Sequence, residues 1–203
     1  MKLYYARGAC SLSVHIALRE AGLAFDLVKY DIPKATLEAP GKIQDVNVKG
    51  YVPVLVLDDG QRLTEVAVVL QYVADRVPDK KLAPPAGTME RYRLQEWLNF
   101  TATEIHKLFW PFFHEAAAPE KPTVEPRLRK SLDFADRAVA ERPFLMGETF
   151  TVADCYLFNV VNWIKPAGLD VAAWPHLRDY RARILERPAV RAAMEAEGLL
   201  KRV

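Results

Sequence analysis

Short apolar runs alternate with amphipathic segments through the first third of the chain, a pattern that predicts strands separated by helices. Strands are expected over residues 2–5, 25–30, 54–57 and 61–63, and helices over residues 11–21, 34–46 and 65–77. Gly22 is placed to end the first helix, and Thr64 is placed to cap the third. Asp58-Asp59-Gly60 is a hairpin signal between the last two strands. Since strands joined by helices pair in parallel and a hairpin is antiparallel, the sequence predicts a mixed sheet.

The pattern changes at residues 78–88, which contain three prolines and one glycine. Such a stretch cannot continue a helix, so it is expected to form a linker. Beyond it, the apolar spacing predicts helices from Met89 to about Trp110 and over residues 128–139. Further helix starts are predicted at Thr151-Val152-Ala153-Asp154, Pro175 and Pro188. We therefore expect an α/β domain over residues 1–77, a linker over 78–88 and an all-α domain over 89–203.

The composition is that of a globular protein, with 51% hydrophobic and 27% charged residues among 203. A formal net charge of +2 and the lack of a basic block argue against a general nucleic-acid binder. No apolar run approaches the roughly 18 residues of a membrane span, and no signal peptide is recognisable. Cys10 and Cys155 cannot build a disulfide framework, and no histidines and cysteines show metal-ligand spacing. We expect a cytoplasmic protein with no metal, no membrane partner and no nucleic-acid partner.

Cys10-Ser11 stands where the first strand turns into the first helix. The first N–H groups of a helix are unpaired and its dipole favours negative charge, so a thiolate of the protein or of a ligand is stabilised there. The spacing Cys10-Ser11-Leu12-Ser13 provides no second cysteine, so redox chemistry would need an outside thiol. A small buried hydrophobic residue is an equally good interpretation of Cys10.

Two segments could hold the ends of a peptide-like ligand. A cis bond at Val52-Pro53 would leave the backbone of Val52 free to pair with an extended peptide. At Thr64-Glu65-Val66, free helix N–H groups could hold a carboxylate while Glu65 holds an ammonium group. An acid in the first turn is also routine for helix stability alone, and this simpler interpretation is favoured.

Asn99, Thr103, His106 and Trp110 are spaced to share one face of the long helix, with Lys107 beside them. This face could turn toward the first domain, where His106 near a thiol could donate a hydrogen bond. A partly buried histidine at a domain interface is the alternative. Several aromatic residues could line an apolar pocket, although such residues are more often part of the core. They are Trp110, Phe112, Phe113, Phe158 and Trp163.

Taken together, these segments resemble the cytosolic glutathione transferases of the bacterial beta class. In the first half, the resemblance rests on Tyr5, Gly8-Ala9-Cys10-Ser11-Leu12, Ala17-Leu18-Arg19-Glu20, Asn47-Val48-Lys49-Gly50, Val52-Pro53-Val54-Leu55, Leu57-Asp58-Asp59-Gly60 and Leu63-Thr64-Glu65. In the second half, it rests on Glu96-Trp97-Leu98-Asn99, Thr103-Glu104-Ile105-His106-Lys107 and Phe150-Thr151-Val152-Ala153-Asp154-Cys155-Tyr156-Leu157. The family implies a thioredoxin-like α/β N-terminal domain, an all-α C-terminal domain and a homodimer. Its substrates are glutathione and a small hydrophobic electrophile.

The resemblance also implies roles for individual residues. Cys10, Ser11 and His106 would act at the glutathione sulfur. Val52 would pair with the cysteinyl backbone beside a cis Pro53, and Glu65 and Val66 would hold the γ-glutamyl end. The full set implied to bind glutathione is Tyr5, Tyr51, Val52, Pro53, Glu65, Val66, Asn99, Thr103 and Lys107.

Three positions depart from the family pattern at the glutathione site. Val66 stands where serine or glycine is usual, Tyr51 where glutamine is usual, and Ala35 where a lysine is often found, with Lys34 as its neighbour. Two lost hydrogen bonds would weaken glutathione binding by roughly tenfold to a few hundredfold.

The main hypothesis is an enzyme whose bound glutathione thiolate attacks electrophiles, with thiol-disulfide exchange through Cys10 as a further activity. The alternative is a ligand-binding or protein-interaction protein with the same fold.

Overall fold

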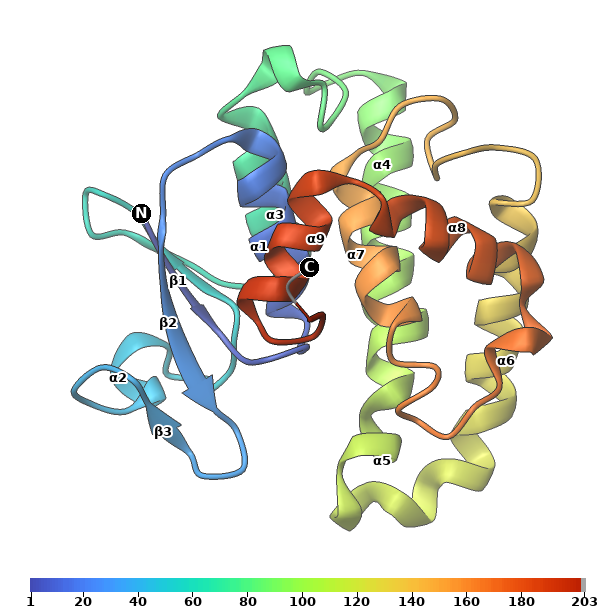
Figure 1. The fold of residues 1–203 in the computed structure, drawn as a ribbon, viewed down its shortest axis with the longest axis horizontal. Helices are drawn as coiled ribbons and strands as arrows, with labels where there is room; N and C mark the ends of the chain where they lie inside the picture. The colour runs from blue at the N-terminus through green and yellow to red at the C-terminus, as the bar shows by residue number, and fades with distance from the viewer. Residues whose placement is uncertain (202–203) are drawn as a thin grey trace.

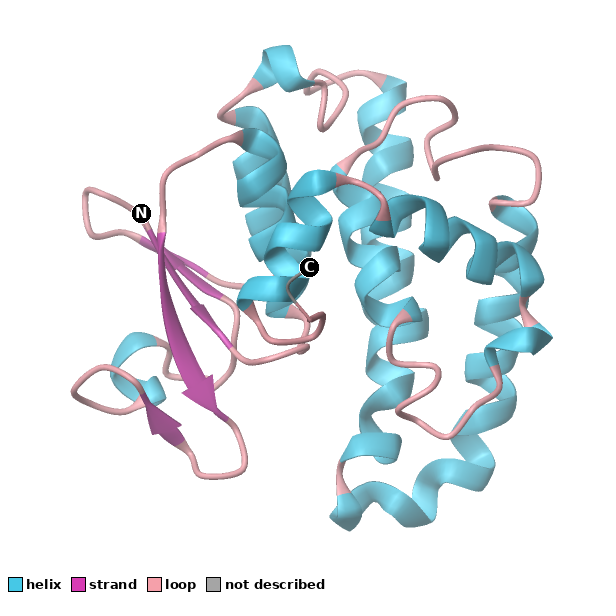
Figure 2. Ribbon diagram, in the orientation of Figure 1, coloured by secondary structure: helices cyan, strands magenta, loops and turns pink. Residues whose placement is uncertain are grey.

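A five-stranded mixed sheet forms one side of the molecule, and helices form the rest (Figure 2). The computed structural model describes residues 1–201, so the last two residues of the predicted helical domain lie outside the described part. The strands are β1 (Lys2–Tyr5), β2 (Asp26–Asp31), β3 (Thr36–Leu37), β4 (Val54–Val56) and β5 (Arg62–Leu63). Their order is β3-β2-β1-β4-β5, with β1 and β2 parallel and the other pairs antiparallel. The predicted mixed sheet and hairpin are confirmed.

The helices of the sheet domain are α1 (Ser11–Ala21), α2 (Ile43–Val46) and α3 (Val66–Asp75). Gly22 ends α1 with a φ of 68°, as predicted. The predicted helix over residues 34–46 is largely wrong, because Pro40 and Gly41 interrupt it and only α2 forms. The predicted cap is also wrong: Glu65 precedes α3 with a φ of 67°, and Thr64 instead accepts a hydrogen bond from Lys49 Nζ at 2.9 Å.

The helical half contains α4 (Met89–Phe100), α5 (Trp110–Phe113), α6 (Lys121–Ala138), α7 (Val152–Val161), α8 (Pro175–Leu185) and α9 (Pro188–Ala196). The predicted long helix is α-helical only to Phe100. It continues as a π-helical stretch (Thr101–His106) and a 3-10 turn (Lys107–Phe109). Shorter 3-10 turns cover Pro78–Lys80, Glu115–Glu120 and Val171–Ala173. Across residues 1–201, no helix combines the length and apolarity that a membrane crossing needs.

Helix α7 lies between the two halves and packs against α1, α3 and α4 (Figure 1). Its start confirms the predicted capping box. The buried Asp154 carboxylate accepts hydrogen bonds from the N–H groups of Thr151 and Leu145, both at 2.8 Å. The Tyr180 hydroxyl donates to the same carboxylate at 2.9 Å. Burial raises the pKa of Asp154, and these donors oppose the shift. This network fixes α7, which carries part of the cavity wall described next.

Candidate active site

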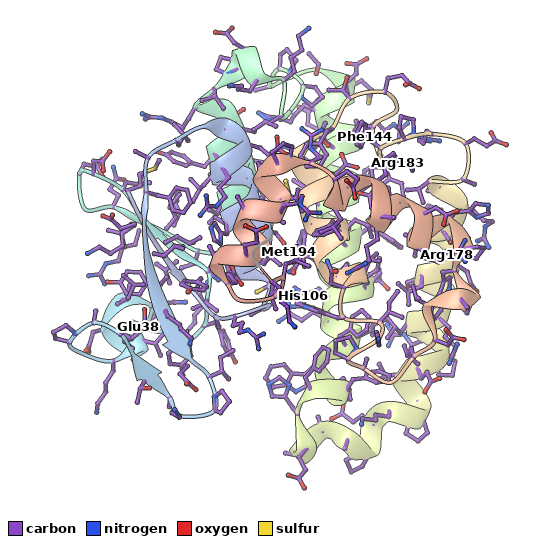
Figure 3. The ribbon with its side chains drawn as sticks, in the orientation of Figure 1. Glu38, His106, Phe144, Arg178, Arg183 and Met194 are labelled. Atoms are coloured by element: carbon purple, nitrogen blue, oxygen red, sulfur yellow. The ribbon has the colours of Figure 1, made fainter. Side chains whose placement is uncertain are left out.

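A cavity of about 1450 Å³ lies between the sheet domain and the helical half. Its sheet-domain wall includes Gly8, Ala9, Cys10, Tyr51, Val52, Pro53, Glu65 and Val66. Its helical wall includes His106, Lys107, Phe109, Trp110, Phe113, Tyr156, Asn159 and Trp163. Figure 3 shows His106 near the middle of the molecule, between these two walls. The fold therefore brings residues more than 150 positions apart into one site.

Cys10 immediately precedes α1 and lies on the cavity wall. Its thiol donates a hydrogen bond to the carbonyl oxygen of Val52 at 3.3 Å. Burial raises the pKa of Cys10 to about 12, outweighing the lowering effects of the Cys10 and Ser11 backbone N–H groups and of Lys107. The helix start does favour a thiolate at this point, as expected, but for Cys10 itself burial has the larger effect and favours the neutral thiol.

Ser11 and Tyr5 do not line the cavity. Ser11 is fully buried, and its Oγ accepts from the N–H of Ala6 at 3.1 Å while donating to the Ala6 carbonyl at 3.2 Å. Tyr5 is also buried, with its ring 6.2 Å from that of His15. The structure thus gives Ser11 a role in shaping the loop before α1, and corrects the prediction that its hydroxyl faces a ligand sulfur.

The loop before Cys10 is held by the segment that follows α9. The Glu197 carboxylate accepts from the N–H of Gly8 at 2.9 Å and contacts His15 Nδ1 at 2.9 Å. The side chains of His15 and Glu197 are both fully buried. Arg7 donates to the carbonyls of Glu197 and Gly198 at 3.0 and 2.6 Å. The sequence carries no local signal for this contact, because its partners are separated by 189 positions.

The peptide bond between Val52 and Pro53 is cis, as considered from the sequence. Tyr51 beside it is 61% exposed, and its carbonyl accepts from Asn47 Nδ2 at 2.8 Å. Val52 lines the cavity just before β4, and its carbonyl accepts the hydrogen bond from the Cys10 thiol.

Glu65 and Val66 lie where α3 begins, at the other end of the same wall. Val66 is the first residue of α3, so its N–H has no acceptor within the helix. The Glu65 carboxylate is 2.5 Å from Lys49 Nζ. Ala35 and Lys34 do not line the cavity, and Lys34 instead pairs with Asp31 at 3.7 Å. A neighbouring lysine therefore does not replace the one absent at position 35.

His106 is the polar group of the helical wall nearest the aromatic residues. Its Nδ1 lies 2.7 Å from the Tyr156 hydroxyl, and its ring centre lies 4.9 Å from that of Trp163. Burial, with a smaller contribution from Lys107, lowers the pKa of His106 to about 4, so the imidazole is neutral at pH 7. Burial also raises the pKa of Tyr156, which keeps its proton. When Tyr156 donates to Nδ1, the histidine proton lies on Nε2, which can donate to a ligand.

The four residues predicted to share one helix face do not all reach the site. His106 and Trp110 line the cavity, whereas Asn99 and Thr103 are exposed and lie outside it. The π-helical stretch has a wider turn than an α-helix, so it changes the angular phase on which the predicted face depended. A glutathione-binding role for Asn99 and Thr103 has no support within one chain. Lys107, predicted beside them, does line the cavity.

The aromatic prediction is right in part. Trp110, Phe113 and Trp163 line the cavity, whereas Phe112 does not line it and Phe158 is fully buried core. Trp163 is fixed by its indole N–H, which donates to the Gly8 carbonyl at 2.8 Å. Sequence reasoning missed Phe109 and Tyr156 as wall residues; the aromatic run that contains Phe109 was the available signal. Within residues 1–201, no cluster of three or more His, Cys, Asp or Glu side chains is placed to hold a metal ion.

Comparison with known proteins agrees with this architecture. The family models "Glutathione S-transferase, N-terminal domain" and "Glutathione S-transferase, C-terminal domain" match residues 8–76 and 100–188. Glutathione S-transferase GstA of Escherichia coli O157:H7 is 45% identical over 200 residues, which cover 98% of this chain and 100% of the relative.

Two solved structures extend the comparison. A bacterial beta-class glutathione S-transferase of Sphingomonas chungbukensis matches with a TM-score of 0.92 and 43% identity, covering 98% of this chain and 100% of that one. A sphingomonad glutathione S-transferase complexed with glutathione matches with a TM-score of 0.93, the same 43% identity and the same coverage of 98% and 100%. The thioredoxin-like domain, the helical domain and the resemblance to the beta class are confirmed, and the chain belongs to the glutathione S-transferase family.

Proposed function

We propose that the protein is a glutathione S-transferase enzyme, which binds glutathione on the sheet-domain wall and directs its thiolate at a hydrophobic electrophile on the helical wall. The observation that carries this proposal is the cavity itself. The backbone of Val52, the helix start at Val66 and a neutral His106 line one space together with an aromatic surface. Family membership supports the same activity.

Glutathione fits the sheet-domain wall by its chemistry. The γ-glutamyl carboxylate would accept from the free N–H of Val66, and the ammonium group would bind the Glu65 carboxylate, which Lys49 now contacts. The cysteinyl backbone would pair with Val52 as an added strand, next to Tyr51. This placement brings the ligand sulfur to the start of α1, beside Cys10.

The thiol of bound glutathione would lose its proton more readily there than in water. The unpaired N–H groups at the start of α1 favour negative charge, and His106 Nε2 can donate to the sulfur. A neutral donor at the opposite wall contributes this hydrogen bond without needing protonation. The thiolate then attacks an electrophilic carbon: the C–S bond forms, and a leaving group departs with its electron pair. The rings of Phe109, Phe113 and Trp163 would hold the apolar body of the electrophile.

Cys10 contributes a hydrogen-bond donor in this proposal and is not the nucleophile. Exchange with glutathione disulfide would need the Cys10 thiolate, and burial disfavours that form strongly. We expect Cys10→Ala to retain most conjugation and to lose any mixed disulfide with glutathione. Mass spectrometry of the protein after incubation with glutathione disulfide measures the second effect. Complete loss of conjugation in Cys10→Ala would contradict this role.

A homodimer is the proposed assembly, and the cytoplasm the proposed location. Val68 on α3 and Met89 and Tyr92 on α4 are 50%, 63% and 53% exposed, which supports a partner surface on these helices. Cys10 and Cys155 are both free, as a reducing compartment would keep them.

Calorimetric titration of the reduced protein with glutathione tests the proposed function first, followed by conjugation of 1-chloro-2,4-dinitrobenzene. We expect binding in the micromolar to low millimolar range and conjugation above the uncatalysed rate. No heat, no change in thermal stability at high glutathione and no conjugation would contradict the proposal. That result would favour the alternative, a ligand-binding or protein-interaction protein with this fold.

A further inference from the structure

Positively charged residues outnumber acidic residues on the lining of the cavity. Seven lysine or arginine residues line it, namely Arg7, Lys49, Lys107, Arg127, Lys165, Arg178 and Arg181. The acidic residues on the same lining are Glu65 and Glu120. Some of the cations are already engaged: Lys49 pairs with Glu65, Arg178 pairs with the neighbouring Asp179, and Arg7 binds backbone carbonyls.

Three of the remaining cations lie on the helical half, away from the proposed glutathione wall. Arg127 is on α6, Lys165 follows α7 and Arg181 is on α8. Among residues 1–201, none of the three lies within 4 Å of a carboxylate. We call Arg127, Lys165 and Arg181 the distal cations. Glu120 is the acidic residue on this part of the lining.

Arg181 gives the clearest sign that this end is built for an anion. Its side chain is half-buried, and its Nε donates to Asn162 Oδ1 at 2.7 Å, which fixes the guanidinium on the cavity wall. Burial lowers the pKa of Arg181, with no acidic neighbour opposing the shift. A half-buried guanidinium with unused N–H donors gains most from a carboxylate, which can bind it through two hydrogen bonds.

We propose that the electrophile of this enzyme carries a carboxylate at the end remote from its reactive carbon, and that the distal cations bind this carboxylate. The inference rests on the proposed transferase function and deepens it. The aromatic rings of the helical wall line the same cavity as His106 and the distal cations, so they suit the apolar body of such an electrophile. A cavity whose lining carries an excess of positive charge also concentrates anionic ligands.

Ethacrynic acid and its methyl ester form a matched pair of probes. Both have an apolar aromatic body and an enone, and only the acid has a remote carboxylate. In the reaction, the glutathione thiolate adds to the terminal methylene carbon, the π-electron pair moves to the carbonyl oxygen, and water supplies the proton that ends on the α-carbon. After correction for the uncatalysed rate, we expect kcat/KM to be about tenfold higher for the acid. Added sodium chloride should reduce this preference because it screens charges.

The variant Arg127→Gln/Lys165→Gln/Arg181→Gln should lose the preference for the acid while conjugating the ester as before. Lys130→Gln is the matched control, because Lys130 is an exposed cation on α6 that does not line the cavity. Single Arg181→Gln, with the smallest change to folding, should lower the preference about threefold. Equal kcat/KM values for acid and ester in the unaltered protein would overturn the inference, as would an unchanged preference in the triple variant.

A binding measurement separates this inference from the transferase proposal. The saturated analogue of ethacrynic acid cannot react, so calorimetry with the analogue and its ester, at saturating S-methylglutathione, reports affinity alone. We expect the acid to bind about tenfold more tightly, with the difference lost in the triple variant. This outcome without any conjugation would uphold the distal anion site and contradict the enzyme. Conjugation of the ester and of 1-chloro-2,4-dinitrobenzene, with no preference for the acid in either assay, would uphold the transferase proposal and contradict the distal anion site.

Discussion

The two walls of the cavity are built by different means. The sheet-domain wall consists of turns and helix starts whose charges are paired, as in Lys49 with Glu65, and whose loop is fixed by the buried Glu197. The helical wall consists of side chains: aromatic rings, a neutral His106 and cations, three of which have no acidic partner among residues 1–201. Backbone groups recognise what every peptide has in common, whereas side chains can be exchanged one at a time. The proposed glutathione site therefore faces a wall whose ligand preference can change by single substitutions.

Glu197→Ala provides the largest test of the sheet-domain wall. Removal of the buried carboxylate leaves the Gly8 N–H and His15 Nδ1 without their partner, and should lower the free energy of unfolding by about 3–5 kcal/mol. Thermal or urea unfolding measures this loss. Glu195→Ala is the control, because among residues 1–201 Glu195 makes no ion pair. Equal stability of the two variants would show that the contact does not hold the loop.

His106→Phe tests the polar group of the helical wall. Loss of a hydrogen bond to a thiolate costs about 1.5–3 kcal/mol, so kcat/KM should fall about tenfold to a hundredfold. Glutathione affinity, measured by calorimetry without electrophile, should change little. Retained kcat/KM would mean that the start of α1 alone stabilises the sulfur.

The protonation of His106 can be followed separately. The folded-state pKa of about 4 lies below the usual value of about 6.5, so the unfolded chain binds the proton more readily. His106 therefore destabilises the fold as pH falls from about 6.5 toward 4, and is without effect above that window. NMR of the imidazole should show no titration of His106 between pH 5.5 and 8. A midpoint near 6.5 would show that the ring is not shielded from water.

Val66→Ser tests the smallest expected effect, at the start of α3. An added hydroxyl could provide one more hydrogen bond to the γ-glutamyl carboxylate, which should tighten glutathione binding about two- to tenfold. Tyr51→Gln is the companion change at the second departure from the family pattern. Calorimetry with glutathione measures both. An unchanged Kd in the double variant would mean that these departures do not limit binding.

The two walls also differ in how far the sequence predicts them. The features around Cys10, Val52-Pro53 and Glu65 are short motifs, so neighbouring residues in the chain are sufficient to locate them. The Glu197 contact and the distal cations join segments from separate helices, and no local spacing marks them. The helix start before Ser11 was predicted correctly, but the pKa of Cys10 depends on burial, which the sequence does not show. The predicted face through Asn99 and Thr103 does not reach the cavity, because a π-helical stretch, which has no recognised sequence signal, changes the helix phase.

The hydrogen bond from Gly8 to Glu197 also has a consequence for the order of synthesis. Gly8 leaves the ribosome early, and its partner follows 189 residues later. The sheet domain of a nascent chain can pair its strands before then, but the loop before Cys10 gains this contact when the segment after α9 has been made. The start of α1, where the glutathione sulfur is proposed to lie, should therefore reach its final arrangement late in translation.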